Sequence, residues 1–170
     1  MKKLVLILST ILFTLTLFGQ NSSVDELFEK YANKDGFTTV IISKNMFSLF
    51  ASEEESKEDF TKAIKGIESI RILSSDETVP KGSLNFFKEI GKSLPMKEFE
   101  ELMSVKEKDQ EFKMLIRKNG KMINEFLMIG GGNSNVLISI TGNIDLRAIS
   151  NLSKAMDIKG MENLNKIEKK

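Results

Sequence analysis

Two glycine-containing stretches are the parts of this sequence best suited to hold an anion. The first is GGGNSN at residues 130–135, and the second is TGNID at residues 141–145. A phosphate-binding glycine loop follows a strand and opens a helix, so that helix N–H groups point at the anion. GGGNSN lies between two strand-like runs and contains neither Gly-Lys-Ser/Thr nor G-x-G-x-x-G. We therefore interpret it as a strand-to-strand corner that needs positive φ.

The second stretch follows a strand-like run and precedes an amphipathic, helix-like one. We expect Gly142 to form the turn and Asn143 or Asp145 to cap the helix. An anion or other ligand could bind at this corner, beside Gly142, Asn143 and Asp145. The alternative is a capped strand-to-helix corner that binds nothing.

The residue types of the chain exclude several kinds of catalytic site. There is no His and no Cys, so Ser-His-Asp and Cys-His triads, disulfides and thiolate zinc sites are impossible. A Ser-Lys pair is not excluded, but no Ser has a Lys three positions later. The acidic run at 53–55, with Glu58 and Asp59, lacks the spacing of a calcium loop. The sequence therefore indicates no catalytic residue, cofactor or metal site.

The first residues have the three parts of a secretory signal peptide. Lys2 and Lys3 precede an apolar run from Leu4 to Phe18, and small Gly19 precedes polar Gln20. We expect residues 1–19 to be cleaved; an uncleaved N-terminal anchor is the alternative. The chain has no Cys to carry a lipid, so we expect a periplasmic or secreted protein that is not a lipoprotein, with no transmembrane segment after cleavage.

Residues 20–170 are expected to form a single α+β domain. Loss of Lys2 and Lys3 takes the formal charge from +1 to −1, which gives no general attraction to nucleic acid. A helix is expected near the start, capped by Ser23 with Glu26 three residues on. A strand (37–43), a short helix (44–51), a helix at 53–67 and a strand (68–75) follow. Ser83 is expected to cap the next helix, and 96–99 to form a short turn.

The spacing of apolar residues then changes from about four to two. Four strand-like runs follow one another, and Asn119–Gly120 between the second and third predicts a tight hairpin. The fold class is therefore α+β, with an antiparallel or mixed sheet of about six strands. The last four strands form a meander, and the helices pack on one face. Because the strands alternate apolar and polar residues, we expect only that face to be covered.

Two blocks of the mature sequence resemble a known family. They are KY…GFTTVIISKNM and ISITGNIDL. They are similar to the domain of unknown function 4252, which is found mainly in exported proteins of Bacteroidetes and has no assigned activity. The resemblance implies the cell envelope of a Gram-negative bacterium and supplies no catalytic residue.

Three hypotheses for function follow. The first is a non-enzymatic domain that binds an envelope protein, a peptide or a glycan. The second is an envelope hydrolase that uses carboxylates or a Ser-Lys pair. The third is a structural or stress-linked envelope protein that oligomerises through a sheet edge.

Overall fold

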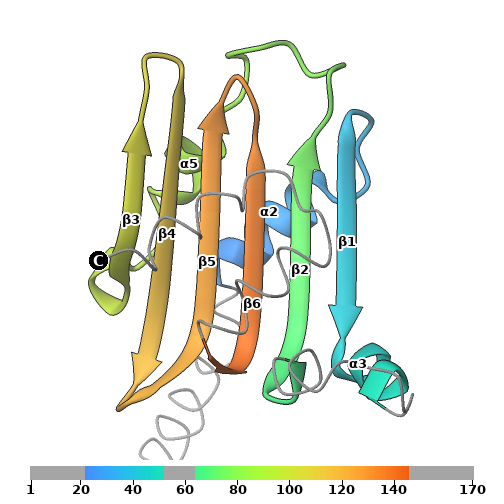
Figure 1. Cartoon of the computed structure of the whole chain (residues 1–170). Helices are drawn as coiled ribbons and strands as arrows, with labels where there is room; N and C mark the ends of the chain where they lie inside the picture. The colour runs from blue at the N-terminus through green and yellow to red at the C-terminus, as the bar shows by residue number, and fades with distance from the viewer. Residues whose placement is uncertain (1–21, 52–63, 146–170) are drawn as a thin grey trace, which may run out of the picture.

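One antiparallel sheet of six strands forms the centre of the part of the chain that the structure describes (Figure 1). The computed structural model describes residues 22–51 and 64–145 of the 170-residue chain. Across the sheet the strands lie in the order β1-β2-β6-β5-β4-β3, and every neighbouring pair is antiparallel. The strands are β1 (Phe37–Ser43), β2 (Ile67–Ser75), β3 (Glu100–Lys106), β4 (Gln110–Asn119), β5 (Met122–Gly132) and β6 (Val136–Ile144). The predicted α+β class and the meander of the last four strands are confirmed.

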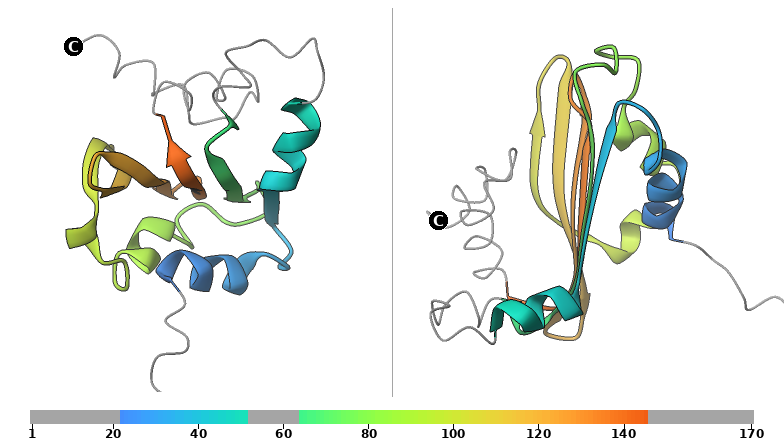
Figure 2. Two further views of the ribbon diagram at one scale, coloured as in Figure 1. Left: turned by 90° about the horizontal axis from the view of Figure 1, so that it is seen from below. Right: turned by 90° about the vertical axis from the view of Figure 1, so that its right-hand side faces the viewer.

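Two helices lie together on one face of the sheet (Figure 2). They are α2 (Ser23–Tyr31) and α5 (Phe86–Ile90), and a short 3₁₀ turn, η2 (Met96–Glu98), follows them in the chain. A third helix, α3 (Lys44–Ala51), continues from the end of β1. The helices expected at 53–67 and after residue 145 lie almost wholly outside the described residues.

The caps predicted for α2 and α5 were wrong by one or two residues. Ser22, not Ser23, caps α2: its Oγ accepts a hydrogen bond from Asp25 N at 3.2 Å, and Asp25 accepts one from Ser22 N. Two overlapping Ser-x-x-acid patterns fit the sequence equally well, and the fold selects the one whose acid also pairs with Arg71. Asn85, not Ser83, caps α5 through a 2.9 Å hydrogen bond from Lys88 N.

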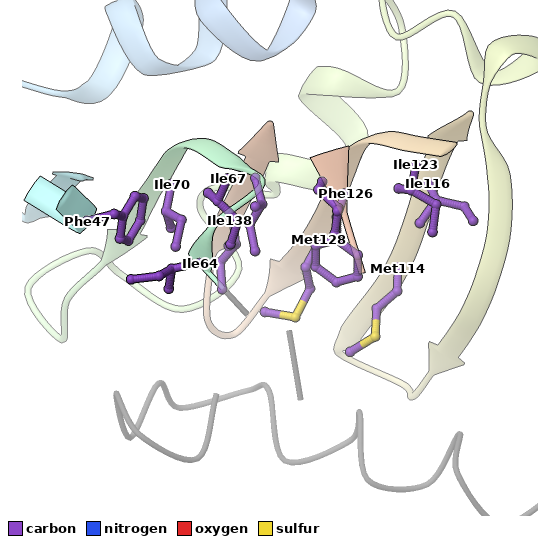
Figure 3. Packing of buried hydrophobic residues seen from close by; sticks show 12 residues of the cluster. Phe47, Ile64, Ile67, Ile70, Met114, Ile116, Ile123, Phe126, Met128 and Ile138 are labelled. Atoms are coloured by element: carbon purple, nitrogen blue, oxygen red, sulfur yellow. The ribbon is translucent and has the colours of Figure 1, made fainter. Parts of the chain in front are cut away.

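Side chains on both faces of the central strands are buried. In β5, Leu127 and Ile129 face the layer of α2 and α5, whereas Phe126 and Met128 face the other side, and all four are 0% exposed. The second face carries its own apolar cluster, to which α3 contributes Phe47 (Figure 3). The expectation of a single covered face was therefore wrong, because β2, β5 and β6 carry apolar residues on both of their faces.

The tight β4–β5 hairpin is confirmed, with its turn displaced by one residue. Asn119 pairs with Met122 as the last residues of the strands, so the turn is Gly120–Lys121, and Gly120 has a φ of 62°. This φ favours glycine because it has no Cβ.

Candidate functional site

The GGGNSN stretch is the corner between β5 and β6, as the sequence predicts. Its three glycines belong to β5, and only Gly132 has a positive φ, of 136°. Gly131 is required for another reason, because a Cβ there would overlap the side chain of Asn85.

The backbone N–H groups of this corner are already used within the protein. Asn133 N donates to Asp109 O at 3.0 Å, Ser134 N donates to Gln110 Oε1 at 2.9 Å, and Asn135 N donates to the Ser75 hydroxyl at 3.2 Å. A hollow of about 380 Å³ beside the corner is lined by charges of both signs: Lys88, Lys106, Lys108, Glu107, Asp109 and Glu111. A phosphate cradle needs free N–H groups, and these three are not free.

Gly142 and Asn143 lie within β6 and not at a strand-to-helix turn. Gly142 has a φ of 129°, and a Cβ there would overlap the carbonyl oxygen of Gly66. Asn143 N donates a 2.7 Å hydrogen bond to that same oxygen. The expectation of a turn at Gly142 was wrong, because Gly142 pairs with Ile67 of β2 and the strand continues to Ile144, which pairs with Ile123 of β5.

An anion site at Gly142, Asn143 and Asp145 stays a prediction. Gly142 and Asn143 line a hollow of about 430 Å³ together with Glu68. Among the described residues that line it, none is basic, and a Glu68 carboxylate disfavours an anion. Asp145 is the last described residue and is exposed.

A third hollow, of about 320 Å³, contains an ion pair. The Arg117 guanidinium binds the Glu125 carboxylate, which is buried, and also lies 3.2 Å from Glu98. Arg117 therefore lies between two carboxylates, so the hollow has one more negative than positive charge. Within residues 22–51 and 64–145, no group of three or more acidic side chains is placed to hold a metal ion.

Two acids with lowered pKa values, Glu89 and Asp25, join the helices to the rest of the fold. Burial would raise the pKa of Glu89, but hydrogen bonds from Lys30 and Tyr31 outweigh it and hold that pKa below its usual value. Burial likewise opposes the lowering of the Asp25 pKa, which the Arg71 and Ser22 hydrogen bonds bring about. These contacts connect α2 to α5 and to β2, so their evident role is structural.

An aromatic cluster anchors the first strand to the helix layer. The ring of Phe37, the first residue of β1, lies 4.7 Å from that of Tyr31 and 6.2 Å from that of Phe86, centroid to centroid. Tyr31 and Phe86 are themselves 5.4 Å apart, and Phe86 is fully buried. The start of β1 is therefore fixed by apolar packing.

Beyond this anchor, β1 presents apolar side chains to solvent. The described residues include six exposed large hydrophobic side chains, and four of them come from β1 and α3: Val40, Ile41, Met46 and Leu49. Ile41 is 67% exposed, and no residue of β1 is charged. An edge strand of this kind offers both unpaired backbone groups and apolar contact to another strand.

The opposite edge of the described sheet, β3, has a different surface. Three of its seven residues, Glu100, Glu101 and Lys106, are charged. Glu100 pairs with Lys118 at 2.6 Å and Glu101 pairs with Lys113 at 2.9 Å, and an irregular register follows Glu101. Charges and bulges are the usual protection of an edge strand against further pairing.

The β1 edge is thus the feature that best qualifies as a functional surface, and sequence reasoning did not single it out. The sequence did contain the signal for this difference: the β1 segment FTTVIIS has no charged residue, whereas the β3 segment EELMSVK has three. What the sequence could not supply was the strand order that places these two segments at opposite edges.

Comparison with known families agrees with the resemblance of the two sequence blocks. The model of a domain of unknown function (DUF4252) matches residues 31–152. The chain belongs to this family. The part that matches the DUF4252 model contains the six described strands, α3, α5 and η2. No curated protein and no solved structure matches the chain. Among the described residues, no helix has the length and apolarity needed to cross a membrane.

Proposed function

We propose that this DUF4252 protein is an exported, non-enzymatic domain of the cell envelope that binds another polypeptide along β1. The observation that carries the proposal is the uncharged β1 edge with Ile41 two-thirds exposed, on a sheet whose central strands are buried on both faces. Of the three hollows described above, one is lined by equal numbers of acidic and basic side chains, one holds Arg117 between two carboxylates and one has a lone acid, which favours a binding role over a hydrolase.

A polypeptide strand fits this edge better than a glycan does. The outward backbone of an edge strand carries N–H and C=O groups at the spacing of another strand, and strand addition uses these groups for affinity. The exposed side chains Val40 and Ile41 supply apolar contact, whereas glycan binding would call for a polar surface. Export is supported by the signal-peptide pattern of residues 1–19.

Export and binding are tested together in bacteria that produce the full chain. A photo-crosslinking residue, p-benzoylphenylalanine, replaces Ile41 in β1 or, as the matched control, the exposed Ser104 in β3. We expect the mature protein in the periplasmic or secreted fraction, and crosslinks to polypeptide from position 41 but not from position 104. A chain that stays in the cytoplasm, or equal crosslinking from both positions, would contradict the proposal.

A further inference from the structure

We infer, building on the proposed binding role of β1, that its partner is β1 of a second copy of this chain. The two strands run antiparallel, and a two-fold axis passes between the two Val40 residues. This arrangement pairs Val40 with Val40, Thr39 with Ile41, Thr38 with Ile42 and Phe37 with Ser43. All seven residues of the strand then have a partner, and the two sheets become one.

The direction of the β1 backbone fits this register. Asp76 N donates to Gly36 O at 2.9 Å, so the backbone of Gly36 faces β2. The β1–β2 pairing continues from Phe37 to Ser43 without a shift, and residues of an antiparallel strand alternate between facing the neighbour and facing away. The backbone groups of Thr39 and Ile41 therefore face outward. Pairing Thr39 with Ile41 of the second copy brings these groups together.

The side chains are also compatible with self-pairing. Residues opposite one another in this register are both even or both odd in number, so each side chain meets one from the same face of the sheet. Ile41 meets Thr39 on the face of α2 and α5, and the two Val40 side chains meet on the opposite face. β-branched pairs of this kind stabilise adjacent strands. Burial of Ile41 and Val40 removes apolar surface from water.

The charges at the two ends of the strand are complementary. Asp35 precedes β1 and Lys44 follows it, there is no charged residue between Phe37 and Ser43, and the ammonium group of neighbouring Lys34 lies over the ring of Tyr31 in α2. An antiparallel pair places the start of one strand beside the end of the other, so each Asp35 lies near the Lys44 of the second copy. A parallel pair would place like charges side by side. The interface is isologous and closes as a dimer, as two-fold contacts do.

Because the chain contains no Cys, a single introduced Cys tests the register directly. Val40→Cys places the two thiols opposite each other in a non-hydrogen-bonded pair, where strands approach most closely. Thr38→Cys, on the same face of the same strand, separates the thiols by roughly 14 Å along the strands. With oxidised glutathione, we expect Val40→Cys to form a disulfide-linked dimer on a non-reducing gel. Thr38→Cys should run as a monomer on the same gel.

Sedimentation of the exported chain measures the association itself. We expect the mass to rise from one to two copies with concentration, Ile41→Lys to weaken association at least tenfold, and Ser104→Lys to leave it unchanged. Circular dichroism of Ile41→Lys checks that it folds, and the Cys pair remains a test if it does not. A chain that stays monomeric, or equal crosslinking of the two Cys variants, overturns the inference. Photo-crosslinks from position 41 to a different protein would then leave the proposed binding role standing, whereas no crosslink at all would remove both.

Discussion

The two edge strands of the described sheet, β1 and β3, have equal length and contrasting surfaces. β3 has three charged residues, ion pairs to β4 and an irregular register, whereas β1 has no charge and pairs regularly with β2. Among the described residues neither edge pairs with a further strand, so the difference lies in how each edge is protected. Charges and bulges hinder the approach of another strand, and β1 has neither. The contrast indicates that pairing is blocked at β3 and permitted at β1.

The two edges are also attached to the helix layer in different ways. Phe37 of β1 packs on Tyr31 and on the fully buried Phe86. On the β3 side, the Arg117 guanidinium lies over the half-buried ring of Phe99 at 5.4 Å. Apolar packing should therefore contribute more to the free energy of unfolding on the β1 side than on the β3 side.

The largest effect is expected from removing the aromatic anchor of β1. Phe86→Ala leaves a cavity in the core and should lower the free energy of unfolding by about 3–5 kcal/mol. The matched change on the β3 side is Phe99→Ala, which removes a ring that is only half buried. It should lower the free energy of unfolding by less than Phe86→Ala does. Urea unfolding of the two variants measures both values. Equal losses would show that the two edges are anchored alike.

A second, intermediate effect is expected in amide exchange. If the outward groups of β1 pair with a second strand, exchange of the Ile41 amide should slow at least tenfold as the protein is concentrated, which corresponds to about 1.4 kcal/mol. The amides of β3 should exchange at rates independent of concentration. Hydrogen exchange followed by NMR reports both strands in one sample. Concentration-dependent protection at β3, or none at β1, would break the comparison.

The smallest effect is expected from two carboxylates that form ion pairs, Glu89 in α5 and Glu100 in β3. The pKa of Glu89 is held below its usual value in the folded protein, so its contribution is present above about pH 4.5 and is lost as the pH falls through the lowered pKa. Glu89→Gln should therefore lower stability at pH 7 and have less effect at pH 3.

The matched substitution is Glu100→Gln in β3, which removes an exposed ion pair with Lys118 and should change the free energy of unfolding at pH 7 by only about 0–1 kcal/mol. Thermal melts of both variants at pH 7 and of Glu89→Gln at pH 3 give the comparison. An effect of Glu89→Gln that grows as the pH falls would contradict the assigned sign.

Much of the local structure could be predicted from the sequence, because it depends on neighbours in the chain. The β-branched run 37–43 forms a strand, Asn119–Gly120 marks a hairpin, and the apolar stripe of Val24, Leu27, Phe28 and Tyr31 is the buried face of α2. The errors in the caps have a specific cause, since Ser22 and Ser23 each have an acid three residues later. Contact with Arg71, which is distant in sequence, distinguishes the two acids.

The prediction of a turn at Gly142 failed for a related reason. Gly142 was expected to form a turn, but its place in β6 follows from the approach of Gly66, 76 positions earlier in the chain. Position 131 likewise needs glycine because the Asn85 side chain occupies the space that a Cβ would fill. A glycine that makes room for a distant segment looks the same in sequence as one that makes a turn.

The sequence by itself determined the α+β class, the four-strand meander, the membership of the DUF4252 family and the absence of histidine and cysteine chemistry. These properties follow from residue types and from spacing over a few positions. Only the tertiary structure decided that β1 and β3 are the edges of the described sheet, that the central strands are buried on both faces, and that the N–H groups of the glycine corner are already bonded. Each of these depends on which distant strands pair, and that is fixed by packing across the whole sheet.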